Sequence, residues 1–281
     1  MSSIKTGQVV SYKEYREEED HKKKGLVFST VIREGVLKIN YIEHIIYDLE
    51  SEDVVSVNDP QVNWDSSLVI SELSSIQQNN LRKVIPIFHA LSKRTVAITG
   101  KARSGKDSLG AAIAEESKVD YYTALGEPIK KIDETIYGKT ERKRRENLVM
   151  LGQGLRGLDP NIWIKSLVKR VVDEVPNYKE QFLEDCVFIV PDVRQPNEFS
   201  FFKNLGATTV KVTADEEKRL ETLVKSDGES ALDENLLKDE TEQHSTDFET
   251  DYTVHNNYDT DFFTLYVDEL VDSLKIEGVI K

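Results

Sequence analysis

Apolar and polar positions alternate in two different ways along the chain. After residue 94, short apolar runs rich in β-branched residues occur at 95–99, 187–190 and 208–212, and longer stretches with helical spacing separate them. Strands that alternate with helices in this way are typical of a parallel sheet with flanking helices. The pattern therefore predicts an α/β fold for residues 93–281.

The amino-terminal part follows another pattern. Apolar runs at 25–32 and 36–42 flank a glycine-containing turn and predict two paired strands. Residues 79–91 have helical apolar spacing, which Pro86 interrupts. We therefore expect residues 1–92 to form a small α+β accessory domain without a chemical motif of its own.

The apolar pattern weakens in an acidic stretch near the carboxyl-terminal end. Residues 215–251 hold 14 acidic and 4 basic side chains, and apolar periodicity is almost absent after Val224. A charged segment with few apolar positions contributes little to a core. This composition is typical of a mobile lid, placed here at about 215–245, or of a disordered insert.

Composition narrows the classes of function. With 51 acidic and 37 basic residues among 281, the net charge is −14, which argues against wide contact with the backbone of a nucleic acid. Cys186 is the single cysteine, so a disulfide framework and a cysteine-rich zinc site are excluded. No apolar run approaches the roughly 18 residues of a membrane span. We expect a soluble, cytoplasmic protein that binds neither membranes nor polymeric nucleic acid.

One glycine-rich loop carries most of the chemical information. Residues 100–108 read Gly-Lys-Ala-Arg-Ser-Gly-Lys-Asp-Ser, with the spacing of a P-loop. The glycines let backbone N–H groups surround an anion, the lysine reaches the outer phosphates, and the following helix directs its positive end to the same point. The loop follows a predicted strand and opens a predicted helix, as the motif requires. The expected ATP-binding residues are Gly100, Lys101, Ala102, Arg103, Ser104, Gly105, Lys106, Asp107 and Ser108.

The residue after the P-loop lysine departs from the usual pattern. A serine or threonine hydroxyl normally binds Mg²⁺ there, whereas this chain has Asp107 followed by Ser108. A carboxylate is also a good ligand for Mg²⁺, directly or through water. Asp192 lies just after a predicted buried strand, where open α/β sheets bind ligands. The expected metal ligands are therefore Asp107, Ser108 and Asp192.

Basic side chains concentrate in one region of this acidic chain. Residues 130–145 hold seven basic and three acidic side chains, which suits either a solvated helix face or the binding of a phosphorylated substrate. Arg194 can place a forked pair of N–H groups on a phosphate. Trp163 suits stacking on a base and a place in the core about equally. The candidate substrate-binding residues are Lys130, Arg142, Arg145, Arg156, Trp163, Asp192 and Arg194.

The P-loop and three later segments resemble one family. Residues 100–108 are similar to the P-loop of the bacteriophage deoxynucleoside monophosphate kinases, in which Arg-Ser-Gly-Lys-Asp-Thr is characteristic, so an aspartate after the lysine is expected there. Residues 125–131 (Leu-Gly-Glu-Pro-Ile-Lys-Lys), 145–163 and 190–198 resemble further segments of that family, and the last resembles its Asp-x-Arg-x-x-Asn-Glu block. The resemblance spans roughly residues 94–274. The animal phosphomevalonate kinases have a similar Ser-Gly-Lys-Asp loop.

The resemblance implies a fold, a reaction and a cofactor. The fold would be a P-loop NTPase-type three-layer parallel sheet with flanking helices and a lid. The reaction would be phosphoryl transfer from ATP, with Mg²⁺, to a (deoxy)nucleoside 5′-monophosphate, giving the diphosphate. Lys106 and Arg194 would be catalytic, and Arg219 would be the lid arginine that closes over the transferred group. If the protein is viral, it would act in the host cytoplasm, in deoxynucleotide metabolism. Whether the protein forms a homodimer stays open.

Two other functions stay open at this point. One is a kinase for another small phosphorylated acceptor, such as phosphomevalonate. The other is a non-catalytic nucleotide-binding module in which residues 1–92 engage a protein partner. The choice of base, and of deoxyribose over ribose, depends on the shape of the pocket and stays open as well.

Overall fold

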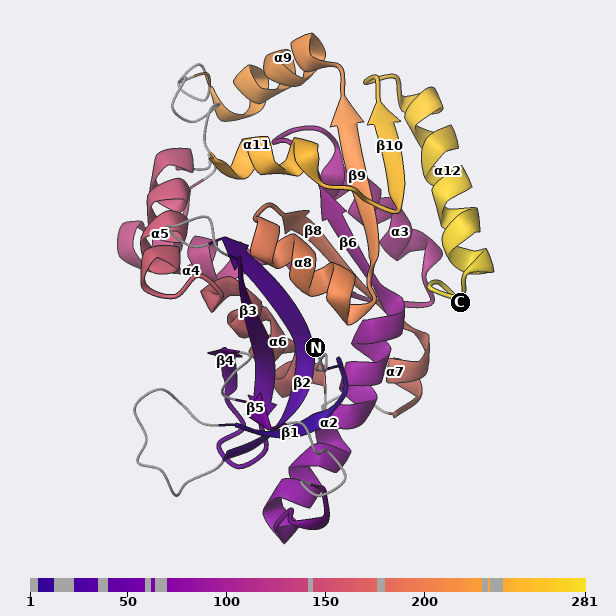
Figure 1. The fold of residues 1–281 in the computed structure, drawn as a ribbon. Helices are drawn as coiled ribbons and strands as arrows, with labels where there is room; N and C mark the ends of the chain where they lie inside the picture. Colours follow the sequence, from indigo (N-terminus) through magenta and orange to yellow (C-terminus); the bar gives the residue numbers. More distant parts are fainter. Residues whose placement is uncertain are drawn as a thin grey trace. The chain divides into compact units, whose positions relative to one another are not determined.

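A computed structural model describes residues 5–12, 23–34, 40–58, 62–63, 70–140, 144–175, 180–228, 232 and 240–281. The chain divides into two units (Figure 1). The first contains Met1–Lys93, Ile164–Glu184 and Pro196–Ala207, and the second contains Arg94–Trp163, Asp185–Gln195 and Thr208–Lys281. Two later segments thus belong with the amino-terminal part, and the independence of residues 93–281 as a domain stays a prediction.

The second unit is built on a parallel sheet of five strands. Its order is β10-β9-β6-β8-β7, and every pair of neighbours runs parallel. The strands are β6 (Thr95–Thr99), β7 (Val119–Tyr122), β8 (Cys186–Val193), β9 (Thr208–Ala214) and β10 (Tyr252–Asn256). All residues of the central β6 are buried, which explains its continuous apolar run. The predicted α/β class with a parallel sheet is confirmed.

Two helices pack on one face of this sheet. They are α3 (Lys106–Glu116) and α12 (Thr260–Ile276), which lies beside β10 in Figure 1. Alternate strand residues such as Val96 and Ile98 contact Leu109 and Ile113 of α3 in one apolar cluster. Alternate side chains of β6 therefore face α3, as the period of two along a strand requires. None of the helices within the described ranges is long and apolar enough to span a membrane.

The first unit contains an antiparallel sheet with the order β4-β3-β2-β1-β5. Its strands are β1 (Val9–Tyr12), β2 (Lys23–Glu34), β3 (Asn40–Asp48), β4 (Val54–Asn58) and β5 (Val62–Asn63). The predicted strand pair is present, but β3 extends six residues beyond the expected end at residue 42. The reason is burial, because Ile45 and Ile46 are fully buried while Ile42 is half exposed.

Helices from three segments of the chain complete the first unit. α2 (Ser75–Arg94) runs through Pro86 and is longer than the predicted helix, and α6 (Ile162–Glu174) and α7 (Glu180–Asp185) lie mostly in this unit. α8 (Pro196–Leu205) packs on β2, where Ser29 Oγ donates to the Phe201 carbonyl at 2.7 Å and Asn204 Nδ2 donates to the Thr30 carbonyl at 2.7 Å. The helix α8 thus packs with the amino-terminal strands, although the sequence pattern places it in the α/β part at residues 93–281.

Candidate active site

The glycine-rich loop lies between β6 and α3, at the carboxyl end of the central strand. Gly100 has φ 142° and Gly105 has φ 104°, backbone conformations that L-residues rarely adopt. A Cβ atom on Gly100 would lie 2.3 Å from the Val212 carbonyl oxygen. Lys106 is 7% exposed, and its Nζ donates to the Lys101 carbonyl at 2.5 Å across the loop. Both glycines are therefore required by the backbone of the loop.

The last residue of the edge strand β10 and a residue just after the strand hold the loop in place. Asn256 Nδ2 donates to the Ser104 carbonyl at 3.0 Å, and the Tyr258 hydroxyl donates to the Arg103 carbonyl at 2.6 Å. Burial raises the pKa of Tyr258, so its hydroxyl keeps its proton and acts as a donor. The sequence analysis did not find these two residues, although their place at the carboxyl end of a parallel strand was a usable signal.

The helix α9 (Glu216–Asp227) lies along the other side of the loop. Arg219 Nη1 donates to the Ala102 carbonyl at 2.9 Å, and Leu223 is buried against Ala102. Arg219 also pairs with Glu216 at 2.7 Å and holds the pKa of that carboxyl below its usual range. Arg219 is 4% exposed and does not line the cavity described below, so its role as a lid arginine stays a prediction.

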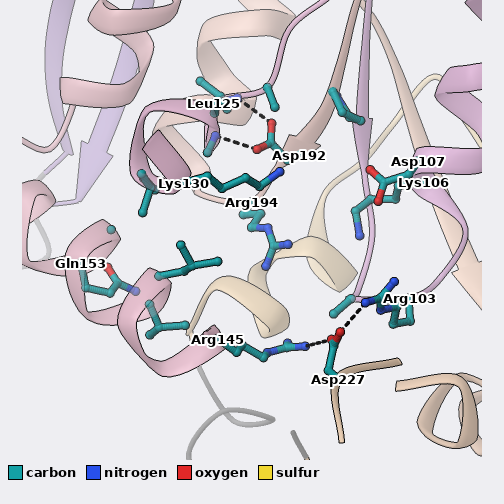
Figure 2. Close-up of a pocket in the computed structure, with 18 of the residues that line it drawn as sticks. Arg103, Lys106, Asp107, Leu125, Lys130, Arg145, Gln153, Asp192, Arg194 and Asp227 are labelled. Carbon is teal, nitrogen blue, oxygen red and sulfur yellow. Dashed lines mark hydrogen bonds and ion pairs between the residues drawn. The ribbon is translucent and has the colours of Figure 1, made fainter. Parts of the chain in front are cut away.

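A cavity of about 240 Å³ opens beside the P-loop (Figure 2). Its wall is formed by residues of the P-loop, the segment after β7, α4 (Glu127–Tyr137), α5 (Arg145–Leu158), the end of β8 and the last residue of α9. The P-loop contributes Ala102, Arg103, Lys106 and Asp107 to this wall. All these elements belong to the second unit.

Asp192 and Arg194 enter the cavity from the end of β8. The Leu125 N–H donates to Asp192 Oδ1 and the Gly126 N–H donates to Asp192 Oδ2, each at 2.7 Å. The carboxylate therefore anchors the turn from which α4 begins. Figure 2 shows the Arg194 side chain projecting into the middle of the cavity.

The structure brings most of the predicted cationic residues together. Lys130 of α4 and both Arg145 and Arg156 of α5 line the cavity with Arg194. The two arginines of α5 are eleven positions apart, which is three helical turns, so they share one face of the helix. Arg142 lies outside the described residues. The cavity wall thus contains the P-loop lysine, these four cationic side chains and Arg103 of the P-loop.

Trp163 lies in the core of the second unit. Its side chain is 3% exposed, its Nε1 donates to the Gly152 carbonyl of α5 at 3.3 Å, and it does not line the cavity. Of the two alternatives for Trp163, stacking on a base or a place in the core, this position agrees with the second. The indole instead supports the middle of α5, the helix that carries Arg145 and Arg156.

The donor set of the cavity suits a magnesium ion that arrives with phosphates. Within the described ranges, no three His, Cys, Asp or Glu side chains converge on one position. Mg²⁺ is commonly bound by one or two carboxylates together with phosphate oxygens and water, and Asp107 at the cavity wall fits that need. Asp192 lines the cavity too, whereas Ser108 does not. The metal role of these three residues stays a prediction.

Three further polar side chains line the cavity wall and were not among the candidates from the sequence: Tyr122, Gln153 and Asp227. Burial, followed by the carboxylates of Asp107 and Asp192, raises the pKa of Tyr122 to about 12, so the phenol stays neutral. No group in the described part of the chain hydrogen-bonds to the Gln153 amide, which Figure 2 shows at the α5 wall. None of the three has a sequence motif that marks it.

The sheet and its loop define the class of protein. Numbered from β6, the strands have the order 2-3-1-4-5, and the P-loop follows the central strand, which is a P-loop NTPase-type α/β fold. No known protein family matches the chain, and no curated protein sequence does.

Solved structures to which the chain is similar include two shikimate kinases. The enzyme from Aquifex aeolicus vf5 has 16% identity over 66% of this chain and 98% of its own, with a TM-score of 0.34. The enzyme from Bacteroides thetaiotaomicron has 16% identity over 65% of this chain and 98% of its own, with a TM-score of 0.39. Because these scores are low, the assignment of the fold depends on the strand order and the P-loop of this chain alone. The resemblance to bacteriophage deoxynucleoside monophosphate kinases stays a prediction.

Proposed function

We propose that this protein is a kinase that transfers the terminal phosphoryl group of ATP to a (deoxy)nucleoside 5′-monophosphate. The observation that carries the proposal is the shared cavity: Lys106 of the P-loop and the arginines Arg145, Arg156 and Arg194 line the same space. A kinase for a phosphorylated acceptor needs two neighbouring anion sites, one for the donor phosphates and one for the acceptor phosphate. A nucleotide-binding module would need only the first.

The roles follow from charge and position. Backbone N–H groups of residues 101–108 and the start of α3 hold the donor phosphates. Lys106 neutralises charge that develops on the transferred group, and Arg194, whose side chain projects into the cavity, would contact donor and acceptor phosphates alike. Asp107 would hold Mg²⁺ directly or through water, and the ion would neutralise charge on the donor phosphates. No covalent nucleophile is required.

The wall opposite the P-loop supports a nucleoside as the acceptor. Leu125, Ile129, Leu148 and Val149 give this wall an apolar surface, and Gln153 adds one neutral amide. A flat base suits an apolar wall, and an amide can both donate to and accept from a base edge. An acceptor such as phosphomevalonate would place a carboxylate there, and a neutral amide stabilises a carboxylate less than a cation does.

A substrate panel tests this function. The full chain is assayed with Mg·ATP against ribo- and deoxyribonucleoside monophosphates of each base and against phosphomevalonate, with ADP formation as readout. We expect turnover of one or a few monophosphates. Turnover of phosphomevalonate alone would replace the acceptor, and ATP binding without any turnover would favour a non-catalytic module. Action in the cytoplasm, in deoxynucleotide metabolism of a bacteriophage, belongs to the same proposal.

A further inference from the structure

Asp227, the last residue of α9, joins two arginines at the wall of the cavity (Figure 2). Its Oδ1 pairs with Arg103 of the P-loop, and its Oδ2 lies 3.8 Å from Nη1 of Arg145 on α5. The Asp227 side chain is 7% exposed, and all three residues line the cavity. An enclosed carboxylate thus lies between two guanidinium groups that come from different elements.

The same two guanidinium groups suit a phosphate. Arginine forks match phosphate oxygens, and a phosphate carries more charge and more acceptor oxygens than a carboxylate. A phosphate between Arg103 and Arg145 would lie next to the Asp227 carboxylate, and like charges at such a distance in a partly enclosed site repel strongly. The carboxylate and a phosphate therefore cannot hold both arginines at once.

We propose that Asp227 occupies the position of a substrate phosphate while the cavity is empty, and that the incoming phosphate displaces it from Arg103 and Arg145. The proposal rests on the proposed function, since it takes the cavity as the substrate site. Each binding event then includes the loss of one ion-pair network, so Asp227 lowers the apparent affinity for the phosphate. It also links occupancy of the cavity to the position of the end of α9.

The attachment of α9 to the P-loop indicates which part of the helix moves. The helix is fixed as far as Leu223, because Asp215 caps it and both Arg219 and Leu223 contact Ala102. Its last turn is tied to the loop through Asp227. Gly228, with φ 90°, follows at once and can change its backbone conformation at little cost. The end of α9 can therefore leave the cavity while the beginning stays on the loop.

Calorimetric titration of the full chain tests the exchange. The probes are inorganic phosphate, which represents an acceptor phosphate without a base, and Mg·ADP, which represents the donor. Asp227→Asn keeps the size of the side chain and removes its charge, and it should bind one or both probes about tenfold more tightly. Glu221→Gln, a matched change on an exposed position of the same helix, should bind both as the parent does. The probe whose affinity rises identifies the phosphate that Asp227 replaces.

The other outcomes are equally decisive. Unchanged affinity of Asp227→Asn for both probes overturns the exchange, and weaker binding would mean that Asp227 orients the arginines. If the variant does not fold, hydrogen exchange in the parent chain gives the answer: phosphate should speed exchange of amides 224–228, and unchanged or slower exchange overturns the proposal. Failure of the proposed function is recognised separately, as absence of turnover in the substrate panel, because phosphate binding by the parent does not depend on it.

Discussion

Each of the two units has a carboxylate that accepts backbone N–H groups, but the surroundings of the two carboxylates differ. In the first unit Asp48, which is 2% exposed, accepts from the Tyr12 hydroxyl at 2.5 Å and from the N–H groups of Glu50 and Ser51 at 2.9 and 2.7 Å. In the second unit Asp192 accepts two backbone N–H groups and also lines a cavity. Hydrogen bonding alone therefore does not separate a structural carboxylate from one at a site.

The difference arises from the direction of the strands. In the parallel sheet of the second unit, the carboxyl ends of β6, β8 and β10 lie at one edge, so the residues that follow each strand meet there. In the antiparallel sheet of the first unit, neighbouring strands end at opposite edges, and polar residues such as Asp48 close local turns. The direction of the strands thus decides whether the polar side chains at the strand ends lie close together.

The largest expected effect tests whether the cavity is the reacting site at all. Lys106→Ala should lower kcat by roughly 10³-fold or more, because the lysine acts on charge that develops during transfer. Steady-state kinetics and thermal unfolding measure activity and folding side by side. Lys83→Ala, an exposed lysine of α2 in the first unit, is the control and should leave kcat unchanged. Near-parental activity of Lys106→Ala would exclude the kinase mechanism.

The second prediction compares one glycine of the first unit with two of the second. Gly100→Ala should cost about 2–3 kcal/mol of unfolding free energy and abolish nucleotide binding, because its φ is positive and a Cβ atom meets the Val212 carbonyl. Gly25→Ala in β2 should also destabilise the protein, since its Cβ atom would lie 2.2 Å from Ile46 Cγ2, yet leave binding intact. Gly154→Ala, with nothing within 4 Å, should stabilise α5 by roughly 0.5–1 kcal/mol. Denaturant titration and nucleotide titration separate the three outcomes.

The third prediction makes the same change in both carboxylates. Asp48→Asn should cost about 1–2 kcal/mol of stability without altering the KM of either substrate. Asp192→Asn should raise the acceptor KM about tenfold, since an amide group would face one of the two N–H donors at the start of α4 and shift Lys130. Equal effects of both changes on KM would contradict the distinction between the two units.

The smallest expected effect concerns the metal. Asp107→Ala should raise the Mg²⁺ concentration needed for half-maximal rate several-fold, because a carboxylate at the cavity wall holds the ion or its waters. Asp120→Ala, an exposed aspartate in β7, should leave it unchanged. An unaltered metal requirement in Asp107→Ala would remove this residue from the proposed metal site.

Much of the fold follows from local pattern. The apolar run at 95–99 becomes β6, the loop at 100–105 turns where its glycines allow, and the residues after the lysine form α3, because each of these outcomes depends on neighbouring residues. The cationic group at the cavity was also predicted in large part, since Arg145 and Arg156 share a helix face and Arg194 follows a buried strand.

The remaining site residues depend on contacts between distant segments. Asp227 was part of an acidic stretch that periodicity described only as a lid or an insert, and its pairing with Arg103 requires the packing of α9 on the P-loop. The hydrogen bond from Arg219 to the Ala102 carbonyl likewise joins segments far apart in the sequence, and the role of Arg219 over the substrate stays a prediction. The two alternatives for Trp163 differ only in burial, which a single sequence does not encode locally.

The contact between Asn256 and the P-loop has a consequence for synthesis of the chain. The two bonded residues, Ser104 and Asn256, are 152 positions apart, so a ribosome has made the loop long before it makes the residue that supports it. Contacts of such sequence separation form late and slow the folding of a domain. A nascent chain that ends before residue 256 therefore carries the complete P-loop motif but lacks this support, and the loop gains it only after residue 256 has been translated.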